Sequence, residues 1–392
     1  MNMNEPKLRF KADDGSQFPD WEEKKLSDIF VERREMQCID DEYKLLSFTI
    51  EQGVINPEDK KTNKRDFLMK DKVSKKFLRT EYDDIIYNPA NLKYGAINRN
   101  KLGKGLLSPI YAIFYTEQNA VFMESVVRNP DFIKRSLKYL EGTVIKLMTL
   151  KPRDFLRIKS YIPSLPEQQK IADFLSTIDT VIEKQQATVS AWEERKKGVM
   201  QKLFSQEVRF KADDGSDFPE LEAKSLFDIC EYKNKQSVGK NYVGTENMKQ
   251  NFSGLESLDE ETEMKGVCYC KGDTLMSNIR PYLRKTWKAD REGVCSTDVL
   301  VFHPIDVVSE YLHYLIASDK FISYVMTGVK GVKMPRGDKE HMMKFSIMVP
   351  SLPEQQKIAD CLSALDAVIE KQKETLEKWQ ELKKGLLQQM FV

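Results

Sequence analysis

A chain of 392 residues is long enough to form two or three domains, each with its own hydrophobic core. Charged residues make up 31% of it and the formal net charge is +1, so a nucleic-acid partner would have to meet a local basic surface. No apolar run is long enough to cross a bilayer and the N-terminus lacks the apolar stretch of a signal peptide, so we expect a cytoplasmic protein without a membrane partner. The six cysteines show no framework spacing and fit reduced thiols.

The first predicted element is a loop, residues 9–23, which opens with the octapeptide RFKADDGS. The octapeptide recurs at 209–216, within a second such loop (208–223), and both copies continue to a Phe-Pro pair. Asp-Asp-Gly-Ser is a turn sequence. Because a flexible tether would not need an aromatic residue and a proline, we expect both loops, called collars below, to dock on the rest of the chain.

The first variable segment, 24–160, is predicted to fold as an α+β globule. Short β-branched and aromatic runs predict strands at Asp84–Tyr87, Tyr111–Tyr115 and Val121–Met123, and Asp131–Leu140 has a helical pattern. Two stretches are basic: 60–79 holds nine Lys or Arg against two Asp, and 91–101 contains no acidic residue.

A long helix is predicted to follow this segment. Pro166 suits the first turn of a helix and is followed by Glu167. Apolar residues then recur at spacings of four and three as far as Leu203, provided that the polar residues Gln185 and Lys196 are included in the series. Roughly 38 residues at 1.5 Å each give a helix of about 57 Å. A seam of this length and spacing requires a helical partner.

The second half of the chain repeats this plan. PSLPEQQKIAD at Pro163–Asp173 recurs unchanged at Pro350–Asp360, and further matches continue at the same offset of 187. The second variable segment, 224–347, differs almost everywhere from the first, yet it also predicts strands (Thr274–Met276, Val299–Phe302) and a helical stretch (Ser309–Tyr324). The predicted organisation is therefore a globule at 1–162, a helix at 163–207, a globule at 208–349 and a helix at 350–392.

The two long helices are predicted to pair with each other. Two similar halves in one chain most simply pair about a pseudo-twofold axis, which favours an antiparallel coiled coil with the globules at its opposite ends. The apolar positions assigned to this pairing are Ile171, Leu175, Ile178, Ile182, Val189, Trp192, Val199 and Leu203 in the first helix, and Ile358, Leu362, Leu365, Ile369, Leu376, Trp379, Leu386 and Met390 in the second. The polar members Gln185, Lys196, Gln372 and Lys383 either set the register or mark a loosely packed part of the seam.

Motifs for catalysis, nucleotide binding and metal binding are missing. The three histidines His303, His313 and His341 lack metal spacing, Cys268 and Cys270 have no second pair, and neither the P-loop nor the dinucleotide fingerprint occurs. Asn88-Pro89-Ala90-Asn91 only superficially resembles the N-P-P-[FY] motif of adenine methyltransferases, because the second proline and the stacking aromatic are absent. We therefore expect no catalytic residue and no metal or cofactor bound by this chain.

Basic residues cluster with aromatic and amide side chains in four loop-like stretches: 60–79, 91–101, 277–285 and 330–337. Arg and Lys neutralise phosphates, Asn and Gln pair with adenine edges, and Arg pairs with guanine. The residues assigned to DNA contact are Asn91, Lys93, Tyr94, Asn98, Arg99, Lys101, Lys104, Asn278, Arg280, Tyr282, Arg284, Lys285, Lys330, Lys333 and Arg336. For any one of these residues alone, the alternative is an ordinary solvated surface position.

Two dissimilar globules, each followed by a P-x-L-x-E-Q-x-x-I-A-x-x-L helix, resemble the specificity (S, or HsdS) subunits of type I restriction-modification systems. Gly272–Ser277 resembles the Gly-Asp-hydrophobic strand of that family, whereas Tyr82–Asn88 in the first globule keeps only its shape. Ser296–Asp298 and Met334–Arg336 also lie where the second recognition domain of the family carries such residues.

The resemblance implies that each globule is a target recognition domain that reads one half of a split site on double-stranded DNA. It implies that the helices fix the spacer and dock two modification (methyltransferase) subunits, which bind S-adenosylmethionine and methylate adenine at N6. Restriction subunits would join through this complex and use ATP and Mg. The chain itself would catalyse no reaction, and the complex would act in the cytoplasm of a bacterium. The residues leave two alternatives open: a coiled-coil scaffold that joins two protein partners, and an enzyme with an unrecognised acid pair.

Overall fold

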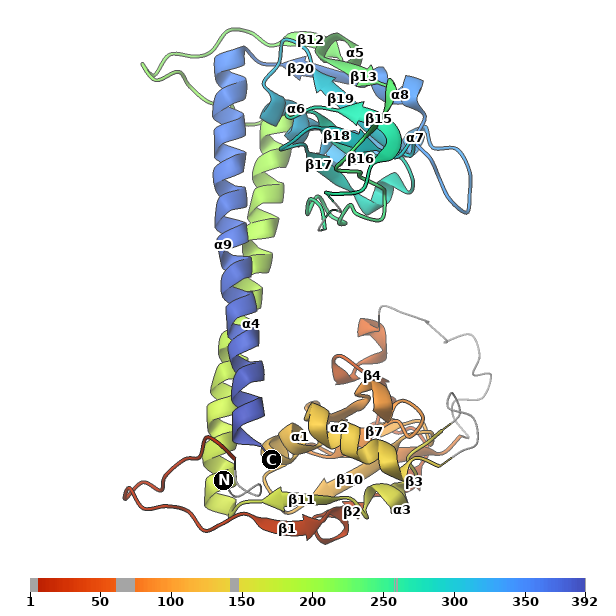
Figure 1. Ribbon diagram of the computed structural model, residues 1–392, viewed down its shortest axis with the longest axis vertical. Helices are drawn as coiled ribbons and strands as arrows, with labels where there is room; N and C mark the ends of the chain where they lie inside the picture. Colours follow the sequence, from red (N-terminus) through yellow and green to blue (C-terminus); the bar gives the residue numbers. More distant parts are fainter. Residues whose placement is uncertain (1–5, 61–74, 142–147, 257, 259, 392) are drawn as a thin grey trace. The chain divides into compact units, whose positions relative to one another are not determined.

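The computed structural model describes residues 6–60, 75–141, 148–256, 258 and 260–391. The chain divides into two compact units, Met1–Gln185 with Thr375–Val392, and Gln186–Glu374. Each unit holds one globule of mixed helix and strand together with parts of two long helices, α4 (Leu165–Ser205) and α9 (Leu352–Met390) (Figure 1). This arrangement confirms the predicted fold class, two α+β globules joined by two long helices.

The first globule is built on a four-stranded antiparallel sheet with strand order β2–β10–β7–β8. These strands are β2 (Phe30–Glu32), β10 (Ala112–Thr116), β7 (Ile85–Tyr87) and β8 (Ile97–Arg99). Around them lie the pair β1 (Glu22–Lys25) and β11 (Lys159–Ile162), the sheet of β3 (Met36–Gln37), β6 (Phe77–Thr80) and β9 (Gly105–Leu107), and the hairpin of β4 (Ser47–Thr49) and β5 (Gly53–Ile55). The helices are α1 (Ala120–Arg128), α2 (Pro130–Ser136) and α3 (Pro152–Phe155).

The second globule repeats three of these four groups of strands. Its four-stranded sheet has the order β13–β19–β16–β17, made of β13 (Cys230–Lys233), β19 (Val299–Pro304), β16 (Thr274–Ser277) and β17 (Thr286–Lys288). The two-stranded pair is β12 (Glu222–Ser225) with β20 (Ser346–Val349), and the three-stranded sheet is β14 (Gln236–Gly239), β15 (Met264–Tyr269) and β18 (Gly293–Cys295). The helices are α5 (Leu226–Ile229), α6 (Ser309–Ile316), α7 (Asp319–Thr327) and α8 (Lys339–Met343). One topology is therefore used twice by two different sequences.

The strand predicted at Val121–Met123 is wrong, because these residues lie in helix α1. The side chain of Asn119 caps that helix and accepts a hydrogen bond from the backbone N–H of Phe122 at 3.0 Å. Buried apolar residues then continue to Val127 at helical spacing. A short apolar run does not distinguish a buried strand from a buried helix turn, so the cap was the informative signal.

The ends of the long helices belong to the cores of the globules. In the first unit, Ile171 and Leu175 of α4 and Met390 of α9 pack in the same hydrophobic cluster as Trp21 and Phe122. In the second unit, Leu203 of α4 packs with Ile358 and Leu362 of α9 and with Tyr311 of α6. The beginning of α4 therefore lies beside the end of α9 in one unit, and the end of α4 lies beside the beginning of α9 in the other. This is antiparallel pairing in both units.

A repeated glutamine ties each helix to its globule. The side-chain oxygen of Gln168 accepts a hydrogen bond from the backbone N–H of Asn119 at 3.1 Å, and that of Gln355 accepts one from the backbone N–H of Val308 at 2.9 Å. Both glutamines also donate to the carbonyl of the first proline of the repeated segment, at 2.9 and 2.8 Å. The same contact is thus made twice, at the beginning of α1 and of α6.

The collars dock on the beginnings of the long helices, as predicted from their sequence. The guanidinium of Arg9 donates two hydrogen bonds to the carboxylate of Glu167 (3.1 and 2.8 Å), and Arg209 donates two to Glu354 (3.0 and 2.5 Å). Both carboxylates are buried, where such bidentate pairing is needed to compensate lost hydration. The Nζ of Lys170 additionally donates to the carbonyl of Lys11 at 2.8 Å.

Candidate nucleic-acid interface

The seam between the long helices contains two equivalent ion pairs. All sixteen apolar residues assigned to helix pairing are buried or half-buried. Among the polar members, Lys196 donates to Asp366 at 2.5 Å, and Lys383 donates to Asp179. The two lysines are 187 residues apart and so are the two aspartates. The sequence analysis did not identify Asp179 and Asp366, because they lie outside the apolar series. The repeat offset of 187 residues, which relates them to each other, could have identified them.

The predicted DNA-contacting loops after β7 and β16 share several backbone features, although they differ at the residue before the 3-10 turn, where φ is −116° at Asn91 and 53° at Arg280. The N–H of Asn88 donates to the carbonyl of Ala96 at 2.9 Å, and the N–H of Ser277 donates to that of Lys285 at 3.0 Å. Each loop contains one turn of 3-10 helix, Leu92–Tyr94 in the first globule and Pro281–Leu283 in the second. A residue in the left-handed region ends each turn, with φ 80° at Gly95 and 55° at Arg284. The structure thus brings two predicted loops to equivalent places in the two globules.

A buried aspartate immediately precedes the strand that leads into each loop. Backbone N–H groups three residues earlier donate to Asp84 (from Glu81, 2.7 Å) and to Asp273 (from Cys270, 2.8 Å). The residue before each aspartate has positive φ, 72° at Asp83 and 92° at Gly272. Asp83-Asp84 is therefore the counterpart of the Gly272-Asp273 strand start. The sequence had shown only a similarity of shape because an aspartate occupies the left-handed position that glycine usually fills.

Each of these carboxylates is paired with a cation at the end of an edge strand, β2 in the first globule and β13 in the second. Arg33 donates two hydrogen bonds to Asp84, at 2.8 and 3.0 Å, and Lys233 donates to Asp273 at 2.8 Å. His303 also places its Nδ1 2.6 Å from Asp273. Burial raises the pKa of Asp84, and the hydrogen bonds from Arg33 partly offset this increase.

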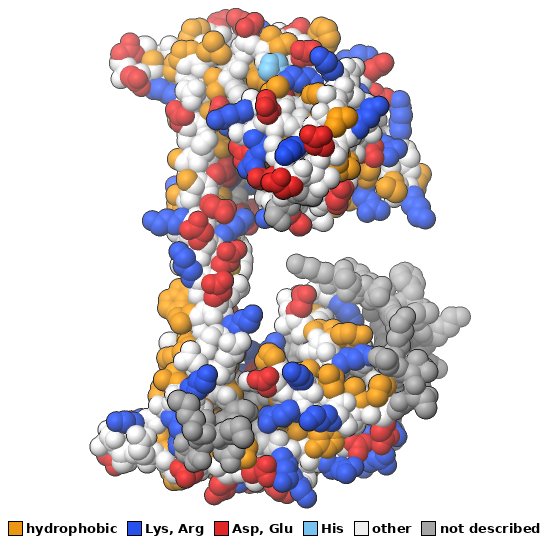
Figure 2. All heavy atoms as spheres, viewed as in Figure 1, with side chains coloured by type: hydrophobic (Ala, Val, Ile, Leu, Met, Phe, Trp, Pro, Cys, Tyr) orange, Lys and Arg blue, Asp and Glu red, His pale blue; other side chains and the backbone are white. Residues whose placement is uncertain are grey.

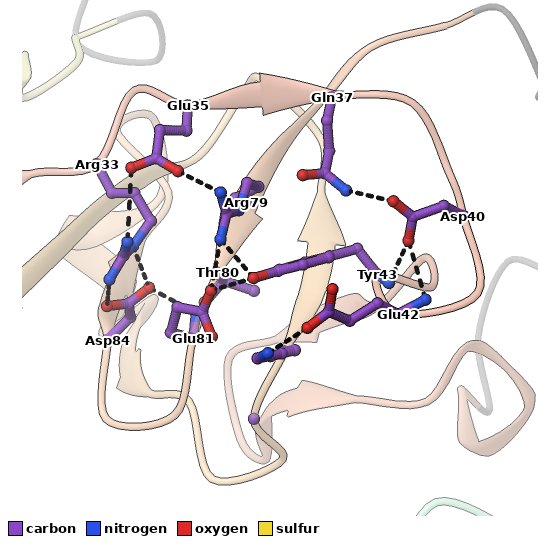
Figure 3. Close-up of polar contacts among 12 residues, drawn as sticks. Arg33, Glu35, Gln37, Asp40, Glu42, Tyr43, Arg79, Thr80, Glu81 and Asp84 are labelled. Carbon is purple, nitrogen blue, oxygen red and sulfur yellow. Dashed lines mark hydrogen bonds and ion pairs between the residues drawn. The ribbon is translucent and has the colours of Figure 1, made fainter.

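In the first globule this ion pair extends into a larger network (Figure 3). Glu35 bridges Arg33 and Arg79 at 3.9 and 2.7 Å, and Arg79 reaches Glu81 at 2.9 Å. The hydroxyl of Tyr43 lies between Arg79 and Glu81, and the Arg79 guanidinium lies 4.5 Å from the centre of the Tyr43 ring. The network joins the four-stranded sheet to the three-stranded sheet. Two arginines face three carboxylates in it, so both cations are occupied by partners within the protein.

Several predicted contact residues are exposed on the two equivalent loops. The Tyr94 side chain is 64% exposed and lies under the ammonium of Lys93, which is 5.1 Å from the ring centre. Arg280 and Tyr282 are exposed on the second loop. Asn91 is half-buried in the first loop, and Lys101 is exposed beyond it. An aromatic ring next to a cation can stack on a base or flank a phosphate.

The stretch 330–337 forms a hairpin beside the second loop. Lys330 and Arg336 exchange backbone hydrogen bonds of 2.8 and 2.9 Å, and the N–H of Arg280 donates to the carbonyl of Pro335 at 2.8 Å. An open hollow of about 690 Å³ lies here, lined by Asn278, Lys330, Met334, Arg336, Lys339 and neighbouring residues. Lys333 is exposed on the hairpin. The second loop and the hairpin therefore form one basic surface.

Other predicted contact residues are engaged within the protein. Asn98 is buried in β8 and donates to the carbonyl of Ile50 at 3.1 Å, and Arg99 is paired with Glu124 (3.2 Å) and Asp83. The sequence predicts a loop over the whole stretch 91–101, but Ile97–Arg99 is a strand that turns these side chains inward. We therefore correct the assignment of Asn98 and Arg99 to a DNA-facing loop.

Ion pairs and hydrogen bonds also engage basic residues at the edges of the predicted surface. Lys104 is paired with Glu42, Arg284 with Asp319 (2.9 Å), and Lys330 with Asp338. Arg336 pairs with Asp298 at 3.1 Å, and Lys285 donates to the carbonyl of Thr245 at 2.7 Å. Exposed ion pairs of this kind are weak enough to exchange for a phosphate. Most of the basic stretch 60–79 lies outside the described residues.

Charged side chains of both signs are intermixed on the surface. On the face shown in Figure 2, Lys and Arg side chains lie among Asp and Glu on both globules.

Among the residues that the structure describes, no three His, Cys, Asp or Glu side chains are grouped so that they could hold a metal ion. Within the same residues, no helix combines the length and apolar character needed to cross a membrane.

Comparison with known proteins identifies the class. Residues 219–378 match the family described as the type I restriction modification DNA specificity domain. The MjaVIII specificity subunit of a type I restriction enzyme from Methanocaldococcus jannaschii is 25% identical over 350 residues, covering 79% of this chain and 81% of that protein. The EcoDI specificity subunit from Escherichia coli is 27% identical over 157 residues, or 38% of this chain and 34% of that protein.

Solved structures share the fold. The crystal structure of a type I restriction-modification S subunit from M. genitalium has a TM-score of 0.53 at 14% identity and covers 99% of both chains. A chain from a study of complex assembly and conformational transition of the type I restriction-modification system has a TM-score of 0.54 at 15% identity, covering 94% of this chain and 97% of that one. Residues 219–378 therefore carry a type I DNA specificity domain. Over most of its length the chain is similar to the specificity subunits of type I restriction-modification systems, the family that the doubled helix motif resembles.

Proposed function

We propose that each globule reads one half of a split site on double-stranded DNA. The observation that carries this proposal is the pair of equivalent loops, Asn88–Ala96 and Ser277–Lys285. Both have the same closing hydrogen bond, a 3-10 turn and a left-handed residue after it, and this common frame presents different side chains. Tyr94 and Lys93 occupy one frame, and Tyr282 and Arg280 the other. Side chains that differ in a common frame would select different base sequences, since base edges are distinguished by donor, acceptor and methyl patterns.

We further propose that α4 and α9 fix the spacing between the half-sites and that two copies of a modification subunit dock on equivalent surfaces. The repeated contacts Arg9–Glu167 and Arg209–Glu354 support two equivalent docking surfaces. Leu165 and Leu352, at the beginnings of the two helices, are 52% and 53% exposed. Equivalent surfaces with equally exposed apolar residues fit two copies of one partner.

The chemistry of the complex belongs to its other subunits in this proposal. The modification subunits would bind S-adenosylmethionine and methylate adenine at N6. Restriction subunits would use ATP and Mg, and the complex would act where the chromosome lies, in the cytoplasm of a prokaryotic cell.

Sequencing of N6-methyladenine in the host, with and without the gene, tests this function. We expect one split motif to disappear when the gene is deleted. In matched variants, Arg280→Ala combined with Arg336→Ala should weaken or relax the second half of the motif, and Lys93→Ala combined with Tyr94→Ala should affect only the first half. A methylation pattern unchanged by deletion would refute the proposal, and so would variants that alter both halves equally.

A scaffold that joins two protein partners remains the competing function. DNA affinity should fall steeply as salt increases, because each neutralised phosphate releases counterions. A contact dominated by apolar side chains would change little over the same range. Measuring binding between 50 and 200 mM salt, a range over which several phosphate contacts give about a 10³-fold loss or more, separates the two functions.

A further inference from the structure

The hairpin Lys330–Arg336 is fixed at its base and apolar at its tip. Its two backbone hydrogen bonds close the hairpin, and the bond between Arg280 and Pro335 fastens it to the second loop. An antiparallel bridge between Ile279 and Arg336 adds a further attachment. Figure 1 shows the segment between α7 and α8 projecting from its globule. A projecting segment with a fixed base can present its tip to a partner at little entropic cost.

The tip side chains are unusual for a solvated turn. Val332 is fully exposed, the most exposed of the large hydrophobic side chains in the described part of the chain, and Met334 is 50% exposed. Gly331, at φ 89°, provides the turn. Lys330, Lys333 and Arg336 surround this apolar tip and are themselves exposed. A turn that only had to be soluble would favour polar residues, so the combination of apolar tip and basic flanks indicates a partner with both anionic and apolar groups.

We propose that this hairpin enters the major groove of the half-site read by the second globule, with Val332 against the 5-methyl group of a thymine. The inference rests on the proposed reading of DNA. The major groove, about 12 Å wide, leaves more room for a projecting hairpin than the minor groove, about 6 Å wide. Among the unmodified bases, only thymine presents a methyl group, and it does so in the major groove. Lys330, Lys333 and Arg336 would lie toward the phosphates on either side.

The test uses the complete chain assembled with its modification subunits. The probes are duplexes carrying the split site found by methylation sequencing, with the thymines of the second half-site replaced one at a time by deoxyuridine, which removes only the methyl group. We expect one replacement to weaken binding about three- to fivefold, the loss that corresponds to one buried methyl group. Val332→Ser should weaken binding to the thymine probe by a similar factor and should bind both probes equally.

Val238→Ser is the matched control, since Val238 is 61% exposed in the same globule but lies in β14. This control should keep the wild-type preference for thymine. The inference is overturned if the wild-type complex binds every deoxyuridine probe as tightly as the thymine probe, or if Val332→Ser keeps the preference. Either result would leave the proposed function standing, because that function requires discrimination of the split site and does not require a contact between Val332 and a thymine methyl group.

Discussion

The ion pair between Lys196 and Asp366 should contribute more to stability than its counterpart between Lys383 and Asp179. The Lys196 side chain is 18% exposed, and Lys383 is 30% exposed. The hydroxyl of Tyr314 also donates to Asp366 at 2.7 Å, and the Lys196 ammonium lies 5.1 Å from the centre of the Tyr314 ring. Removing the Lys196 ammonium therefore leaves the Asp366 carboxylate without its cation and removes the cation that lies near the Tyr314 ring.

The magnitude follows from exposure. Exposed ion pairs contribute about 0.2–1 kcal/mol, and hydrogen bonds to charged groups in more buried places about 1.5–3 kcal/mol. Asp366 is 44% exposed, so solvent screens part of the interaction. We expect Lys196→Ala to lower the free energy of unfolding by about 1–1.5 kcal/mol and Lys383→Ala by about 0.5 kcal/mol.

Equilibrium urea denaturation of the full chain measures these differences, and hydrogen exchange of Gln186–Ser205 locates them in α4. A double-mutant cycle of Lys196→Ala with Asp366→Ala should give an interaction energy of about 1 kcal/mol. The reasoning is refuted if the two single substitutions add without interaction, or if Lys383→Ala is as costly as Lys196→Ala.

Three further predictions concern spacing, pH and the buried carboxylates. Seven residues inserted after Ala187 and seven after Glu374, which are 187 positions apart, lengthen each helix by about 10.5 Å. Methylation sequencing should then show a spacer that is about 3 base pairs longer, at 3.4 Å for each base pair. Altered half-site sequences would contradict the proposed division of roles. Burial, with Lys196 nearby, lowers the pKa of His313 to about 4. In the unfolded chain the imidazole takes up a proton near pH 6.5, so protonation favours unfolding as the pH falls from 6.5 toward 4. The free energy of unfolding should therefore decrease by at most about 2 kcal/mol between pH 7 and 5. Thermal unfolding of His313→Asn should lack that part of the slope, and an unchanged slope would exclude His313 as its source. Asp84→Asn weakens the pairing with Arg33 and should lower the unfolding temperature by about 5–10 °C, the shift expected for about 2–3 kcal/mol, while the second half of the methylation motif stays unchanged.

The two long helices could be predicted from the sequence because their sequences repeat within the chain. The identical segments at Pro163 and Pro350 locate both helices, and the apolar series predicted which faces are buried. The seam ion pairs were only half predicted, since the series identifies Lys196 and Lys383 but not the acidic residues on the flank of the opposite helix.

The globules were less accessible, because their strands are short and their pairing partners are distant in the chain. The apolar run at Val121–Met123 predicts a strand, whereas Asn119 caps a helix there. The inward orientation of Asn98 depends on β8 pairing with β7, which no local pattern encodes. The equivalence of Asp84 and Asp273 became visible only through the backbone, because the two sequences around them share little beyond the aspartate itself.

The contact made by Gln168 and Gln355 has a consequence for how such a protein changes over time. Each amide oxygen accepts from a backbone N–H, of Asn119 in one globule and of Val308 in the other. Every residue except proline offers that donor, whatever its side chain. Mutations in a globule can therefore accumulate, or a whole globule can be exchanged for another of the same topology, without a compensating change in the helices. A lineage under pressure to alter its target sequence can do so while its assembly machinery stays the same.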